Sequence, residues 1–100
     1  IDKIQVVKIA DIQRCESDRS YCHIYRADGT KITSSKPLKE FDELLGEYDF
    51  FRIHKSHMIN LAYIKRFERT EGGYVVMNDD TRVPVSFRKR DELIAALEQF

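Results

Sequence analysis

The sequence predicts a mainly β protein with two short helices, and three observations lead to that fold class. Short runs of alternating or β-branched apolar residues recur along the chain, separated by turn residues. Only two segments carry apolar residues at helical spacing, and both are short. One hundred residues, 42% hydrophobic and 34% charged, suffice for a single globular domain over residues 1–100.

The first half of the chain contains many β-branched residues and one clear hairpin signal. Asp28-Gly29 separates two candidate strands, and glycine accepts a positive φ there without steric cost. In the segment before this turn, Ile24 lies on one face and His23 and Tyr25 lie on the other. Strands are expected over residues 4–9, 11–16, 21–26 and 30–34.

The apolar pattern changes to that of a helix over residues 37–45. Pro37 suits a first helical turn, Ser35 or Lys36 is the expected cap, and Gly46 stands where the helix should end. A helix of this length must dock against the rest of the protein, because it is unstable alone in water. Its apolar stripe is expected to consist of Leu38, Phe41, Leu44 and Leu45.

The second half returns to β structure and ends in a helix. Pro84 indicates an edge strand or a late strand position, since proline has no N–H for a ladder hydrogen bond. Ser86 is expected to cap a terminal helix whose apolar face is Leu93, Ile94 and Leu97. Strands are expected over residues 50–53, 64–69, 74–77 and 82–85.

Charge and cysteine content limit the classes of function. The 17 basic and 17 acidic residues cancel, which argues weakly against a nucleic-acid binder, so local clusters matter more. The sequence has no apolar run of about 18 residues and no signal-peptide pattern, and we expect a cytoplasmic protein.

Cys15 and Cys22 are expected to be reduced thiols on strands, with a disulfide or redox switch as the alternative. No metal or other cofactor is expected.

Residues 50–61 form the most informative segment, because apolar and basic side chains are concentrated there. Its apolar side chains are expected in the core, and its basic and small polar side chains are expected to face a ligand. No carboxylate lies between Arg52 and Arg66, and a second basic cluster follows at residues 88–90. Two basic segments on a small β-rich domain predict a nucleic-acid surface. The acidic residues expected on another face are Glu40, Asp42, Glu43, Glu47 and Asp49.

The order of these features resembles the LytTR family, the DNA-binding output domain of many bacterial response regulators. The resemblance covers nearly the whole chain. It depends on an early strand ending in Glu16 before a polar loop and Tyr21, the short helix, the block from Phe51 to Asn60, and Val83-Pro84-Val85-Ser86 followed by Arg88.

This resemblance implies about seven to ten short strands in several small antiparallel sheets. It also implies loops that enter the major groove of double-stranded DNA and two copies of the domain on direct repeats in promoters. A receiver domain usually precedes such a domain in two-component systems. Since the chain opens on Ile1, we expect it to be the C-terminal output domain cut from a longer response regulator.

By the same resemblance, Lys55 and Arg88 contact bases, and the loop between Glu16 and Tyr21 does so through Arg19 and Tyr21. Lysine and arginine suit the O6 and N7 acceptors of guanine. Contacts to the DNA backbone are expected from Ser20, His54, Ser56, Arg66, Ser86 and Lys89.

Each of these assignments has a structural alternative. Lys55 and Arg88 are alternatively solvated surface residues, Tyr21 a half-buried strand aromatic, and His54 and Asn60 residues that hold turns. A protein-interaction or RNA-binding module using the same basic face remains the alternative function. An enzyme is not expected, because the chain shows no nucleophile motif, no glycine-rich phosphate loop and no third ligand for a histidine pair.

Overall fold

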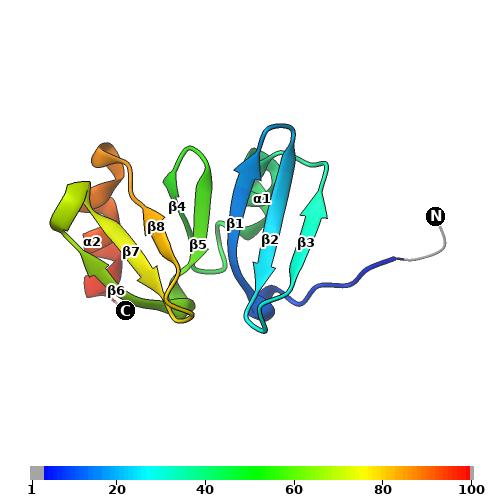
Figure 1. Cartoon of the computed structure of the whole chain (residues 1–100), viewed down its shortest axis with the longest axis horizontal. Coiled ribbons are helices and arrows are strands. Elements are labelled where there is room, and N and C mark those ends of the chain that lie inside the picture. The colour runs from blue at the N-terminus through cyan, green and yellow to red at the C-terminus, as the bar shows by residue number, and fades with distance from the viewer. Residues whose placement is uncertain (1–3, 100) are drawn as a thin grey trace.

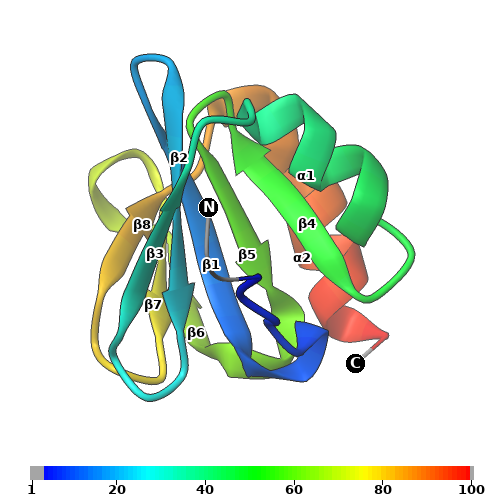
Figure 2. The same cartoon turned by 90° about the vertical axis from the view of Figure 1, so that its right-hand side faces the viewer.

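The computed structural model describes residues 4–99, which form two antiparallel β-sheets with both α-helices on one side of them (Figures 1 and 2). The five-stranded sheet has the order β3-β2-β1-β5-β4, and the three-stranded sheet has the order β6-β7-β8. The strands are β1 (Ile12–Asp18), β2 (Tyr21–Arg26), β3 (Lys31–Ser34), β4 (Phe50–His54), β5 (His57–Asn60), β6 (Ile64–Glu68), β7 (Tyr74–Met77) and β8 (Arg82–Pro84). The helices are α1 (Leu38–Leu45) and α2 (Arg90–Glu98), with 3₁₀ turns η1 (Ile9–Asp11), η2 (Leu61–Tyr63), η3 (Thr70–Gly72) and η4 (Phe87–Lys89).

The mainly β fold class is confirmed, although within residues 4–99 one expected strand does not form and one unpredicted strand does. Residues 4–8 form no strand and run away from the sheets (Figure 1). Ile4 and Val6 are 93% and 80% exposed, so their β-branched side chains have no apolar surface to cover. Conversely, residues 57–60 form β5, which the sequence did not predict. The eight strands of residues 4–99 therefore match the expected number only because these two errors cancel.

Helix α1 buries a narrower stripe than expected. Leu38 and Leu45 are buried and Phe41 packs beside them, but Leu44 is 59% exposed. Consecutive residues are about 100° apart around a helix, so Leu44 points away when Leu45 faces the core. The expected side-chain cap is also wrong, because the cap position is Pro37, which offers no side-chain acceptor.

The β4–β5 hairpin lies between two hydrophobic cores and contributes to both. Phe50 and Met58 pack in the first core with β1, β2 and α1, whereas Ile53 and Ile59 pack in the second core with β7, β8 and α2. Alternate side chains of a strand point to opposite faces, so one hairpin can fill both cores. The position of this hairpin is therefore fixed from two sides.

The buried Asn60 side chain has a structural role. Asn60 is 5% exposed; its Nδ2 donates to the Ile12 carbonyl at 2.9 Å and its Oδ1 accepts from the Ala62 N–H at 3.0 Å. This confirms the structural interpretation of Asn60.

Cys15 and Cys22 are free, buried and on neighbouring strands, as expected. A hydrogen bond between the two thiols raises the pKa of Cys15 and lowers that of Cys22.

No helix within residues 4–99 combines the length and the apolar character needed to cross a membrane.

Candidate nucleic-acid interface

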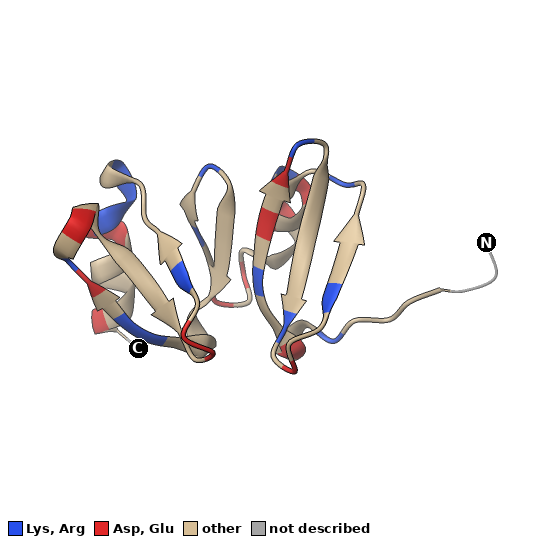
Figure 3. Ribbon diagram, viewed as in Figure 1, with Lys and Arg blue, Asp and Glu red and all other residues tan. Residues whose placement is uncertain are grey.

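Three connections that are far apart in the sequence lie along one long side of the molecule. They are the β1–β2 turn, the β4–β5 turn and η4, which all lie along the upper edge in Figure 1. Lys and Arg residues mark each of them in Figure 3. The basic clusters of the second half and the early polar loop therefore lie on the same side of the fold.

The β4–β5 turn is a two-residue connection, Lys55-Ser56, whose backbone is held by side chains of β4. The Arg52 guanidinium donates to the Lys55 carbonyl at 2.7 Å, and His54 Nδ1 accepts from the Ser56 N–H at 3.1 Å. The Lys55 side chain is exposed. His54 thus holds the turn, as its structural alternative predicted, while Lys55 is free to reach a ligand.

Main-chain hydrogen bonds join the other two connections to this turn. The Ser17 N–H donates to the Ser56 carbonyl at 2.9 Å, which holds the end of β1 beside the turn. The Ser86 N–H donates to the Ile53 carbonyl at 2.8 Å, which places η4 on its other side. Hydrogen bonds to the β4–β5 hairpin therefore hold the ends of the other two connections beside it.

A cleft of about 350 Å³ opens between the β4–β5 turn and η4. Basic side chains dominate its lining, and Arg88 lies across it from Lys55. Its lining residues are Asp42, Arg52, His54, Lys55, Ser86, Arg88 and Lys89. The cleft suits an anionic ligand, because four of these seven residues are Lys or Arg and one is acidic.

Two expectations for this region are corrected. Asp42 does not lie on another face: its Oδ2 is 3.9 Å from Arg52 Nη1 and it lines the cleft. Ser86 lies at the cap position of η4 instead of α2, and its side chain forms no cap hydrogen bond there. Asp42 had no signal in the sequence, since it belongs to α1 and reaches the cleft only through packing.

The β1–β2 turn presents Arg19 and Ser20, which are both exposed. Arg19 adopts a positive φ of 57°, which makes the turn tight. Tyr21 begins β2 and is 52% exposed, so its ring is available at the surface rather than held in the core. Behind the turn, His23 Nε2 lies 3.0 Å from Asp18 Oδ2.

Arg66 is not part of this surface. It lies on β6, and its Nε donates to Glu68 Oε2 at 2.5 Å. That hydrogen bond, together with one from Tyr74, lowers the pKa of the Glu68 carboxyl. The structure therefore brings together His54, Lys55, Ser86, Arg88 and Lys89 around one cleft, with Arg19, Ser20, Tyr21 and Ser56 on the adjoining turns.

A network behind the surface joins Arg14 and Tyr25, to which the sequence gave no site role, with Glu16 and with His57, which is half-buried here instead of facing a ligand. Arg14 Nη1 donates to Glu16 Oε1 at 2.8 Å, and the Arg14 guanidinium lies 3.9 Å from the centre of the Tyr25 ring. His57 Nδ1 lies 3.8 Å from the same Glu16 oxygen. Burial lowers the pKa of His57 below its usual range, even though Glu16 opposes this effect.

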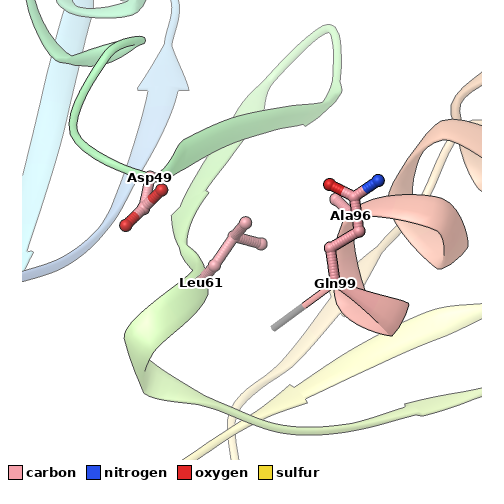
Figure 4. Close-up of a pocket in the computed structure, with 4 residues that line it drawn as sticks. All are labelled: Asp49, Leu61, Ala96 and Gln99. Carbon is pink, nitrogen blue, oxygen red and sulfur yellow. The ribbon is translucent and has the colours of Figure 1, made fainter.

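A second pocket lies away from the basic cleft. In Figure 4, Asp49 and Gln99 lie on either side of Leu61 in this pocket of about 350 Å³, which Ala96 also lines. Among the described residues that line it, Asp49 is the one titratable residue. In the described part of the chain, no group of three or more His, Cys, Asp or Glu residues is placed to hold a metal ion.

Comparisons with known proteins found a matching family model and a similar solved structure. The profile of the LytTr DNA-binding domain matches residues 2–98. A solved LytTr DNA-binding domain, from a protein described as a methyl-accepting/DNA response regulator of Bacillus cereus, is similar with a TM-score of 0.80 and 25% sequence identity. That match covers 91% of this chain and 84% of the other. No curated protein matched. With nearly its whole length matched, the chain belongs to the LytTR family of DNA-binding domains.

Proposed function

We propose that this domain binds specific sequences of double-stranded DNA through the surface formed by its three connections. In this proposal it is the output domain of a response regulator in a two-component system and acts on transcription. The β4–β5 turn and η4 enter the major groove, and the domain binds direct repeats in promoters. Family membership supports DNA binding and transcription regulation.

The placement of Lys55 and Arg88 across one cleft is the observation that carries the proposal. Both side chains are exposed, and they come from connections joined by the Ser86–Ile53 hydrogen bond. Such cations can donate to guanine O6 and N7 in the major groove. Because their backbones are held relative to each other, the two contacts are made at a fixed spacing, which favours sequence-specific reading.

The remaining site residues divide into base-reading and backbone-binding groups. Arg19 and Tyr21, on the neighbouring turn, are proposed to contact bases beside those read by Lys55 and Arg88. Contacts to phosphate position the protein without reading sequence. Those contacts are assigned to Ser20, His54, Ser56, Ser86 and Lys89. Arg66 is the weakest backbone candidate, since it lies outside the surface and is paired with Glu68.

Asp42 and Arg52 are proposed to tune this surface. Asp42 lies near Arg52, so its negative charge partly offsets a cation that already donates to the turn. Lys55 and Arg88 form no ion pair within residues 4–99. They are therefore free to exchange water for base edges.

A second copy of the domain and an upstream receiver domain complete the proposal. Two copies on direct repeats need half-sites about one helical turn apart if both lie on one face of the duplex. A zero net charge predicts modest non-specific affinity for DNA. Binding of two specific surfaces to one DNA would therefore strengthen the overall affinity. We propose no catalytic activity for this domain.

Selection of bound duplexes from a random double-stranded pool tests the proposal. A clear motif, recovered at physiological salt and repeated in one orientation, is the expected result. Recovery of no motif, with binding that disappears as salt rises, would leave only non-specific electrostatic attraction. Competition by an RNA of equal length distinguishes the alternative function, an RNA-binding or protein-interaction module that uses the same basic face.

A further inference from the structure

Phe87 is the most exposed aromatic residue within residues 4–99. It is 83% exposed, although its neighbours Val85 and Leu93 are buried in the second core. A phenylalanine loses favourable burial when it faces water, so its place at the surface calls for a reason other than folding. The residue is the first of η4, directly between Ser86 and Arg88, which both line the basic cleft.

The Phe87 ring is held in place by Arg90. The Arg90 guanidinium lies 5.6 Å from the ring centre, within the range of a cation–π contact. Arg90 in turn lies against Gly73, where an added Cβ would approach Arg90 Nε to 2.9 Å. Gly73 has a φ of 94°, so glycine supplies both the turn and the space. One side of the Arg90 guanidinium therefore faces Gly73, and the guanidinium lies beside the Phe87 ring.

The direction of Phe87 follows from the geometry of η4. Successive side chains of a 3₁₀-helix diverge by about 120°, because it has three residues per turn. Phe87 thus flanks Arg88 instead of covering it.

A phosphate is a poor partner for the ring face, since that face carries partial negative charge. In the major groove, the apolar group on a base edge is the 5-methyl group of thymine.

We propose that Phe87 reads thymine through its 5-methyl group, at a base pair next to the one that Arg88 contacts. This inference depends on the proposed function, because it requires η4 to lie in the major groove. It assigns to the protein a preference for thymine over cytosine at one position of each half-site. The contact is apolar, so it adds sequence discrimination without adding to the salt dependence of binding.

Replacement of thymidine by deoxyuridine removes only the 5-methyl group of the base and so tests this contact directly. The duplex selected from the random pool is compared with a duplex of the same sequence in which deoxyuridine replaces thymidine, one position at a time. The wild-type domain should bind the critical uracil duplex about fourfold more weakly, equivalent to about 0.8 kcal/mol for one buried methyl group. Phe87→Ala should bind both duplexes equally, and Phe87→Leu should keep part of the preference.

Tyr48→Ala is the matched control, since Tyr48 is 50% exposed and lies in the connection between α1 and β4. It should keep the full preference for thymine. The inference is overturned if no uracil position weakens wild-type binding, or if Phe87→Ala retains the wild-type loss. Both results leave sequence-specific binding intact. A wild-type domain that selects no DNA motif would instead refute the proposed function itself.

Discussion

The guanidinium of Arg52 donates a hydrogen bond to the backbone carbonyl of Lys55 at 2.7 Å, and so holds the turn that presents the Lys55 side chain. Arg52 was expected to face a ligand, but its guanidinium forms a hydrogen bond within the protein. Arg52 also lies 3.9 Å from Asp42 of α1, which links the helix to the turn. The shape of the proposed DNA-binding surface therefore depends on this side chain as well as on the two-residue turn.

Replacement of Arg52 should loosen the turn. Arg52→Met keeps the aliphatic stem but removes the donor, and we expect folding stability to fall by about 0.5–1.5 kcal/mol. Specific DNA affinity should fall as well, but by less than in Lys55→Ala. Urea denaturation and DNA titration measure the two effects. Arg69→Met is the matched control, because Arg69 is exposed in the connection between β6 and β7 and does not line the cleft. Wild-type DNA affinity in Arg52→Met would contradict this role.

Lys55→Ala and Arg88→Ala should each lose about 1–3 kcal/mol of binding to the selected site and should discriminate less between bases. Their melting temperatures should be unchanged, since both side chains are exposed. Lys65→Ala is the matched control: Lys65 lies on β6 and is paired with Asp80. Binding by either variant at wild-type strength would remove that residue from the base-reading set.

Lys89→Ala should weaken binding to every sequence by a similar factor. If Lys89 neutralises one phosphate, the slope of log affinity against log salt should become shallower by about one unit. Base preference should not change, since phosphate contacts carry no sequence information. Titrations at several salt concentrations measure the slope, with Lys39→Ala on the outer side of α1 as the control. A slope equal to that of the wild type would place Lys89 away from the phosphates.

Asn60→Ala should reduce folding stability by about 1–3 kcal/mol, because the buried Ile12 carbonyl and the Ala62 N–H would lose their partner. Chemical denaturation measures the loss. Asn78→Ala, at an exposed asparagine, should change stability much less. Equal stability of the two variants would show that the Asn60 hydrogen bonds contribute little.

The lowered pKa of His57 predicts that stability falls with acidification. The folded state binds the His57 proton less readily than the unfolded chain, whose histidines titrate near pH 6.5. The contribution is therefore fully present above about pH 6.5 and is lost as the pH falls from there through the lowered pKa of the folded state. Melting curves between pH 7.5 and pH 5 should show a weaker dependence in His57→Gln. An identical dependence in the variant would assign the effect to other groups.

The sequence predicted β2 and β7 over their exact ranges and most other elements to within two residues, because their alternating patterns and turn residues are local signals. It did not predict β5. Its segment, His-Met-Ile-Asn, has no alternation, since it is buried on both faces between the two cores. Residues 4–9 gave the opposite error: they have β propensity, but no neighbouring strand pairs with residues 4–8.

The basic residues of the candidate site were recognisable because they cluster in the sequence. Asp42, by contrast, reaches the cleft from a helix, and only the packing of α1 against β4 brings it there. Arg66 illustrates the reverse case. It belongs to the same basic stretch, yet β6 carries it to the other sheet, where Glu68 neutralises it. Sequence clusters thus indicate which residues are available, and the topology decides which of them meet.

The hydrogen bonds that join the three connections use main-chain atoms, namely the Ser17 N–H with the Ser56 carbonyl and the Ser86 N–H with the Ile53 carbonyl. Almost any amino acid can supply such atoms, so the frame does not depend on which side chains it displays. Lys55, Phe87 and Arg88 can therefore be exchanged during evolution with little penalty in folding. Under the proposed function, exchange of one of these exposed residues would change the DNA sequence that is bound while the buried hairpin beneath stays the same.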